Sequence, residues 1–202
     1  MNQVLVLYYS RNGSTAAVAR QICRGVESVP GAAALLRTVP PVTTVIEAPA
    51  SPVPPSGPPY ASYEELAQCD GLLLGSPTRF GNMAAPLKYF LDGTGALWAS
   101  GALAGKPAGV FTSTSTLHGG HESTMLSMML PLLHHGMLVC GLPFTDPAVA
   151  RTSRGGGPYG AGTISAGSGA TAALADDEKA LAQHLGRRVA EIAVRLAPPR
   201  TP

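Results

Sequence analysis

The chain has 202 residues, 13% of them charged, and a formal net charge of +2. This length suits one domain with a substantial core and room for insertions. The few basic residues are scattered, which argues against a nucleic-acid-binding surface, and no apolar run reaches the roughly 18 residues that a membrane span needs.

The first predicted element is a buried strand that ends in a polar turn. Residues 4–9 form a continuous apolar run, typical of a parallel strand covered on both faces. Residues 10–15 (SRNGST) follow, and a helix is predicted over residues 14–28. The unpaired amides at a helix N-terminus attract anions, so this turn is a candidate phosphate site. A capped turn without a ligand is the alternative, because Ser and Thr are ordinary N-caps.

The glycine spacing of this turn excludes two common nucleotide motifs. A dinucleotide fingerprint needs three spaced glycines, and here only Gly13 is present. A P-loop needs a Gly-Lys pair, and the first lysine of the chain is Lys88.

Strands and helices then alternate along the chain. Strands are predicted at residues 33–39, 70–75, 107–112 and 137–140, and helices at 62–68, 83–91, 122–135 and 176–196. This alternation predicts an α/β fold in which residues 1–202 form one domain around a doubly wound, five-stranded parallel sheet with helices on both faces. Ligands of such sheets bind at the carboxyl ends of the strands.

Two segments interrupt the alternation. Residues 40–59 contain eight prolines and are predicted to be an extended surface loop. Residues 151–169 are rich in glycine and too long for a bare connection in a compact domain. This second segment is either disordered or a shaped loop near a site or a subunit contact.

Polar loops follow the third and fourth predicted strands. After the third come Pro77 and Gly81, which constrain the loop, with Thr78 and Arg79 as donors and Phe80 as a ring face. After the fourth comes a loop rich in hydroxyls and glycine, residues 112–122. Together with the first turn, these loops can hold a phosphate, the edge of a ring and its face.

Seven stretches make the chain recognisable: residues 4–10, 75–83 (GSPTRFGNM), 90–92, 97–101, 119–120, 133–137 (LHHGM) and 156–160 (GGPYG). In these stretches, which run from the first strand to near the last helix, the chain resembles the WrbA-type NAD(P)H:quinone oxidoreductases. These are flavodoxin-like enzymes that hold the phosphate of FMN in a hydroxyl-rich turn after the first strand.

The resemblance implies a set of site residues. For FMN it implies Ser10, Arg11, Asn12, Gly13, Ser14, Thr15, Pro77, Thr78, Arg79, Phe80, Ser113, Thr114, Ser115, Thr116, Leu117, His118, Gly119 and His134. For the substrates it implies Asn12, Phe80, Trp98 and His134, with His134 as the catalytic residue that contacts the quinone oxygen. It also implies a homotetramer, a dimer of dimers, in which neighbouring subunits supply part of the active-site wall.

Two positions and the length of one loop depart from the family pattern. Asn12 stands where relatives carry an aromatic residue, and Ser14 where a histidine can occur. Leu117 and His118 lengthen the loop after the fourth strand by one residue. These changes bear on nucleotide affinity and on the choice between NADH and NADPH.

The predicted activity is FMN-dependent, two-electron reduction of small quinones to hydroquinones with NADH or NADPH. Hydride passes to the flavin, NAD(P)⁺ leaves, and a quinone takes the same place, which is a ping-pong sequence. A flavodoxin-type electron carrier and an FMN-loaded regulatory or binding protein are the alternatives. The net charge of +2 and the two insertions count against the carrier, which usually has an acidic face.

Histidine and cysteine spacing predicts neither a metal site nor disulfides. Residues His118, His121, His134 and His135 do not form a recognisable ligand motif. Cys23, Cys69 and Cys140 are odd in number and widely separated, which favours a reducing compartment. With no signal peptide evident at the N-terminus, a cytoplasmic location is expected.

Overall fold

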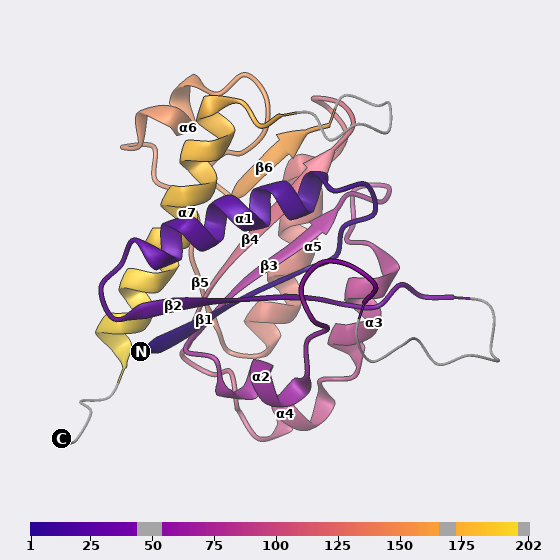
Figure 1. The fold of residues 1–202 in the computed structure, drawn as a ribbon, viewed down its shortest axis with the longest axis vertical. Helices are drawn as coiled ribbons and strands as arrows, with labels where there is room; N and C mark the ends of the chain where they lie inside the picture. Colours follow the sequence, from indigo (N-terminus) through magenta and orange to yellow (C-terminus); the bar gives the residue numbers. More distant parts are fainter. Residues whose placement is uncertain (44–53, 166–172, 198–202) are drawn as a thin grey trace.

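The computed structural model describes residues 1–43, 54–165 and 173–197. Its centre is a parallel sheet of β1 (Asn2–Tyr8), β2 (Ala32–Thr38), β3 (Gly71–Pro77), β4 (Pro107–Thr114), β5 (Leu138–Val139) and β6 (Ala161–Ile164). The strand order is β2-β1-β3-β4-β5, and β6 also pairs with β4 (Figure 1). The predicted doubly wound parallel sheet is therefore confirmed.

Alternating side chains of the central strands build two cores. Val4 and Val6 of β1 belong to a cluster with α1 (Ser14–Glu27) and α7 (Asp176–Leu196). Leu5 and Leu7 belong to a second cluster, on the opposite face, with α2 (Tyr63–Gln68), α3 (Ala85–Asp92) and α5 (His121–His134). Because the strand is buried on both faces, its sequence is a continuous apolar run, not an alternating one.

The fifth position of the sheet is shared by two short strands. β5 pairs with Pro107 and Ala108 of β4, and β6 pairs with residues 111–114 of the same strand. Between them the chain leaves the sheet and forms α6 (Pro147–Arg151) before it returns (Figure 1). Glycine permits the return, because a Cβ on Gly160 would lie 2.0 Å from the carbonyl oxygen of Val110.

The glycine-rich segment therefore differs in part from its prediction as a loop. Its described residues, 151–165, include the end of α6 and the whole of β6; residues 166–169 lie outside the described part. Sequence patterns also missed α4 (Gly95–Ala99) and α6, since five residues are too few to show a helical period.

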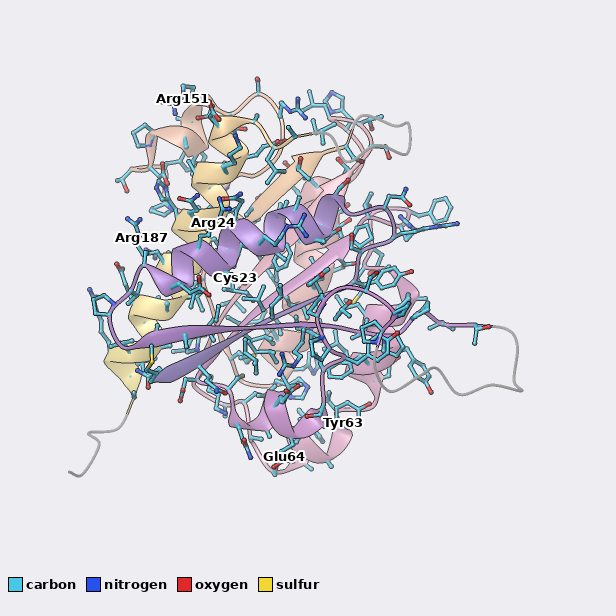
Figure 2. The ribbon with its side chains drawn as sticks, in the orientation of Figure 1. Cys23, Arg24, Tyr63, Glu64, Arg151 and Arg187 are labelled. Carbon is cyan, nitrogen blue, oxygen red and sulfur yellow. The ribbon has the colours of Figure 1, made fainter. Side chains whose placement is uncertain are left out.

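The proline-rich segment matches its prediction where it is described. Residues 40–43 and 54–59 contain neither helix nor strand, and residues 44–53 lie outside the described part. The segment ends with Tyr60 bridged to Thr38 at the edge of β2. Tyr63 of α2, which is labelled in Figure 2, packs its ring against that of Phe90 of α3, with the ring centroids 5.0 Å apart.

Helices α1 and α7 approach each other closely at two glycines. A Cβ on Gly25 would lie 2.0 Å from the carbonyl oxygen of Gln183, and one on Gly186 would lie 2.2 Å from that of Ile22. Cys23 and Arg24 of α1 and Arg187 of α7 lie near this contact (Figure 2). The close approach of the two backbones seals one core under the helix pair. No helix in the described ranges is long and apolar enough to cross a membrane.

We expect Gly186→Ala to lower the free energy of unfolding by about 2 kcal/mol, because the added methyl group forces two helix backbones apart. Gly95→Ala is the matched control: nothing lies within 4 Å of its Cβ position, so a change below about 0.5 kcal/mol is expected. Urea unfolding of both variants measures the difference. Equal stability of the two variants would contradict the close contact.

Candidate functional site

A polar pocket lies at the carboxyl ends of β1, β3, β4 and β6. It is lined by Ser10, Arg11, Asn12, Ser14, Thr15, Pro77, Thr78, Arg79, Ser113, Thr114, Ser115 and Ser165. The structure thus brings together residues from all three loops predicted to form a site. Its lining residues offer hydroxyls and two guanidinium groups and include no carboxylate, so the pocket suits an anion attached to a hydroxylated chain.

The β1–α1 turn presents its amides to this pocket. Gly13, at φ 86°, makes the left-handed turn into the helix. The Ser10 Oγ accepts from the amides of Gly13 at 3.1 Å and Ala16 at 3.4 Å. Within the described residues, the amides of Ser14 and Thr15 have no protein acceptor. These two amides, at the positive end of α1, form an anion cradle.

Hydrogen bonds link the three loops. The Thr15 and Ser113 hydroxyl oxygens are 2.8 Å apart in a buried bond, and the Thr78 amide donates to the Ser113 carbonyl at 2.9 Å. On the outer side, Thr124 of α5 donates its hydroxyl to the Thr78 Oγ1 at 2.8 Å. The pocket lining is therefore held in place before any ligand arrives.

The loop after β3 makes a tight turn that projects Phe80 into solvent. Arg79 and Asn82 exchange two backbone hydrogen bonds, at 2.8 and 3.0 Å. Phe80 sits between them at φ 54°, an unfavourable conformation for a side chain of its size. Its exposed fraction is 106%, so in this chain alone the ring packs against nothing. Strain and exposure together are features of binding residues.

The loop after β4 is arched over a buried histidine. The Thr114 hydroxyl donates its one proton to the Thr116 carbonyl at 2.8 Å, so His121, 2.7 Å away, donates to Thr114 from Nε2. The His121 Nδ1 is then a buried acceptor with no partner among the described residues. Burial lowers the pKa of His121, although Glu122 and Glu178 oppose this.

Four residues predicted to contact the cofactor lie on this arch and not in the pocket lining: Thr116, Leu117, His118 and Gly119. The Gly119 amide donates to the Thr116 carbonyl at 3.1 Å, which closes the arch. Leu117 and His118 instead border a separate hollow beside Glu122.

Ser165, which was not among the predicted site residues, completes the pocket from the end of β6. Its amide donates to the Thr114 carbonyl at 2.7 Å, and its hydroxyl to the same oxygen at 3.0 Å. This residue belongs to a segment predicted to be a loop, and the only signal in the sequence is the pair of hydroxyl residues Thr163 and Ser165 on either side of Ile164.

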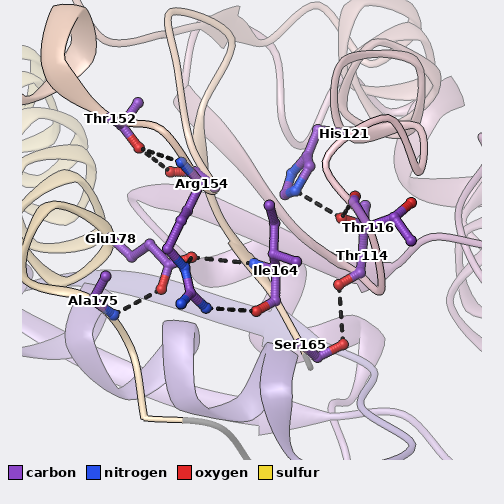
Figure 3. Close-up of polar contacts among 10 residues, drawn as sticks. Thr114, Thr116, His121, Thr152, Arg154, Ile164, Ser165, Ala175 and Glu178 are labelled. Carbon is purple, nitrogen blue, oxygen red and sulfur yellow. Dashed lines mark hydrogen bonds and ion pairs between the residues drawn. The ribbon is translucent and has the colours of Figure 1, made fainter. Parts of the chain in front are cut away.

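A buried carboxylate anchors β6 behind Ser165 (Figure 3). The Glu178 side chain is 0% exposed and accepts from the amides of Ile164 at 3.1 Å and Ala175 at 2.8 Å. The Arg154 Nε lies 3.3 Å from the same carboxylate, and its Nη2 donates to the Ile164 carbonyl at 2.8 Å. Because its acceptors are used, this buried charge is compensated.

Trp98 and His134 do not line the pocket of this chain. Trp98 is on α4, and His134 ends α5, whose first residue is beside the pocket. A helix of 14 residues spans about 20 Å, so His134 lies about that far along α5 from the end that is beside the pocket. A bond of 2.9 Å between His135 Nε2 and the Thr94 hydroxyl ties α5 to α4 there.

No group of three or more His, Cys, Asp or Glu side chains in the described ranges could hold a metal ion. The three cysteines are free thiols. Burial raises the pKa of Cys23 to about 12 and that of Cys69 to about 11, so both thiols are protonated and unreactive at neutral pH.

Comparison with known proteins identifies relatives over nearly the whole chain. The model of the NADPH-dependent FMN reductase family matches residues 3–145. A protein named NAD(P)H dehydrogenase (quinone) from Geobacter sulfurreducens is 44% identical over 200 residues, covering 96% of this chain and 98% of that one. A protein of the same name from Syntrophobacter fumaroxidans is 45% identical over 202 residues, with the same coverage.

Solved structures agree on the fold. A WrbA-like flavodoxin from Agrobacterium tumefaciens has a TM-score of 0.68 at 20% identity, covering 96% of this chain and 99% of that one. Oxidised flavodoxin 1 from Bacillus cereus has a TM-score of 0.60 at 16% identity, covering 98% of this chain and all of that one. The flavodoxin-like fold predicted from the sequence is thereby confirmed.

We expect the stability of the protein to fall as pH drops below about 6.5, the ordinary pKa of histidine. The pKa of His121 is lowered in the folded state, so in this range the unfolded chain binds a proton that the folded chain does not. Burial also lowers the pKa of His135, so this histidine contributes to the same loss of stability at low pH. Urea unfolding at about pH 7.5 and about pH 5.5 measures the fall.

His121→Gln keeps a donor for Thr114 and should show a shallower fall with pH. His118→Gln, at an exposed histidine of the same loop, is the control and should leave the fall unchanged. An unchanged fall in the His121 variant would show that the buried imidazole is not its source.

Proposed function

This chain belongs to the NADPH-dependent FMN reductase family, and on that premise we propose that it reduces quinones to hydroquinones with NADH or NADPH, using FMN. The observation that carries the proposal is the anion cradle of the Ser14 and Thr15 amides, together with the polar loops that follow three parallel strands. The name NAD(P)H dehydrogenase (quinone) of relatives that align over nearly their whole length supports the same activity.

The donor set fits FMN. The amides and hydroxyls of residues 10–15 suit a monophosphate dianion, and Thr78 and Ser165 offer hydroxyl groups to the ribityl chain. Thr78 and Arg79 would also border the flavin ring, with Phe80 beside it. When bound, FMN supplies the two-electron chemistry, accepting hydride from a nicotinamide and passing two electrons to a quinone.

The chain's own groups would position the reactants and balance charge. The polar loop of residues 113–119 would stabilise negative charge at the pyrimidine end of the flavin, as preorganised donors do in other enzymes. Asn12 would contact the nicotinamide nucleotide. His134 would donate a hydrogen bond or a proton to the quinone oxygen, and Trp98 would wall the same side of the substrate.

We further propose that Trp98 and His134 act on the pocket of a neighbouring subunit in a homotetramer. Neither residue lines the pocket of its own chain, and this supports such an arrangement. An exposed apolar row on α5 supports association: Leu126, Leu130 and Leu133 are all solvent-exposed in the single chain.

One pocket would serve both substrates in turn, which gives ping-pong kinetics. Residues 155–160 match the spacing of a dinucleotide fingerprint, but they lead into a strand and not into a helix, so the chain offers no separate dinucleotide motif. The nicotinamide and the quinone would then occupy the same face of the flavin successively. We place the activity in the cytoplasm, where free thiols persist. An electron carrier of the flavodoxin type remains the second candidate, favoured only by the fold.

Anaerobic stopped-flow tests the proposal directly. The FMN-reconstituted protein is mixed with NADPH or NADH and then with benzoquinone. We expect the flavin absorption to bleach in one two-electron step and to return on addition of the quinone, with parallel double-reciprocal plots in steady state. Bound FMN that neither nucleotide reduces would contradict the proposal and favour the carrier.

We expect Ser10→Ala to weaken FMN binding about fivefold. The turn that carries the cradle loses the acceptor of its Gly13 and Ala16 amides, a loss comparable to that of an N-cap. Riboflavin, which lacks the phosphate, should bind as before. Ser62→Ala removes the N-cap of α2, remote from the pocket, and should change neither affinity. Fluorescence titration measures both ligands, and an equal loss for both would contradict a phosphate cradle.

We expect His134→Ala to slow quinone reduction about a hundredfold, the effect of losing one donor to a developing negative charge. The rate of flavin reduction by the nucleotide should stay within about threefold of that of the unsubstituted protein. The melting temperature should not change, since His134 is exposed. His184→Ala, on the other face of the sheet, is the control. Full quinone turnover in the His134 variant would remove this residue from the reaction.

A further inference from the structure

A second, larger hollow shares the walls of the cofactor pocket. Arg11 and Arg79 line both, and the second hollow continues past Tyr9 and Met83 to Lys88 on α3. Its volume of about 810 Å³ is in the range of sites for nucleotide-sized ligands. It is thus a groove that leads away from the anion cradle.

Three cations face this groove, and none of its lining residues is acidic. In the described ranges neither Arg11 nor Arg79 has a carboxylate partner, and Arg79 uses Nη1 only for the carbonyl oxygen of Thr78, at 2.7 Å. Lys88 pairs with Asp92 on the next turn, but both side chains are more than half exposed. Such a pair contributes little and leaves Lys88 able to turn to another anion.

The backbone and the apolar lining residues of the groove also suit a nucleotide. The N-terminus of α3, at residues 84–86, lines the groove and has no acidic residue in its first turn, so its dipole reinforces the positive charge. Val42, Ala85 and Pro86, which are exposed or partly exposed, provide an apolar surface against which a base or a sugar can lie. The groove therefore combines charges for phosphates with surface for a nucleoside.

We propose that this groove binds the adenosine end of NADPH, with Arg11 and Arg79 on the diphosphate and Lys88 on the 2′-phosphate. This rests on the proposed function, which places the nicotinamide at the cofactor pocket. The two shared arginines are next to that pocket, where the diphosphate must follow the nicotinamide ribose. Lys88 is the one cation of the groove outside the pocket lining, where the far end of the dinucleotide reaches. The protein should accordingly prefer NADPH to NADH.

Binding of fragments to the FMN-loaded protein tests the groove without turnover. Calorimetry compares adenosine 2′,5′-bisphosphate with adenosine 5′-monophosphate. We expect the bisphosphate to bind about fivefold more tightly, the upper range for an exposed ion pair, and the preference to weaken with added salt. Equal affinity for the two fragments would overturn the proposal.

Lys88 variants locate the effect. Lys88→Gln should abolish the preference for the bisphosphate and raise the KM for NADPH about fivefold, with kcat and the KM for NADH unchanged. Lys88→Arg should keep both the preference for the bisphosphate and the low KM for NADPH. Lys179→Gln, at a lysine of α7 outside the groove, should have no effect on either. A preference that survives in Lys88→Gln would overturn the assignment.

The two proposals fail in distinguishable ways. If no nucleotide reduces the flavin but the bisphosphate still depends on Lys88, the reductase proposal fails and the groove remains a nucleotide site. If both nucleotides reduce the flavin equally well and Lys88→Gln changes nothing, the groove assignment fails and the reductase proposal stands.

Discussion

The candidate site depends on the need to satisfy the buried polar end of β4. Thr112, Ser113 and Thr114 end the strand where it is covered from both sides, and each must find hydrogen-bond partners in the protein. Thr112 donates to the carbonyl of Ser76 at 2.8 Å, Ser113 bonds Thr15 and Thr78, and Thr114 bonds residues of the β4–α5 loop and of β6. One strand end thereby sets the positions of four neighbouring segments, and the pocket is the space that they enclose.

The parts of this arrangement that could be predicted are those in which burial leaves a pattern within one continuous stretch of sequence. The strand at residues 4–9 is a continuous apolar run because the sheet buries both of its faces. The helix at 176–196, which the structure places at Asp176–Leu196, has apolar residues at helical spacing because it buries one face along its length. The hydroxyl-rich turn at residues 10–15 could be assigned because its chemistry is local to six residues.

The remaining parts depend on contacts between distant segments. Strand β6 has four residues among glycines, and it is a strand only because β4 offers an unpaired edge beyond β5. Ser165 joins the pocket for the same reason. Glu178 shows no sign in the sequence of being more than a helix-start residue, yet it is fully buried and binds β6 as well as capping α7. The proposed roles of Trp98 and His134 cannot be read from a single chain, since the pocket on which they would act belongs to another copy.

The split of the fifth strand has a consequence for biosynthesis. Ser165, the last wall of the pocket, is held through Ile164 by Glu178, so the wall is complete only when the first turn of α7 has left the ribosome. Helix α7 also covers one face of the sheet, and domains generally fold as units. Residues 1–140 alone therefore leave one core uncovered, and the sheet and its pocket close together once α7 has been made.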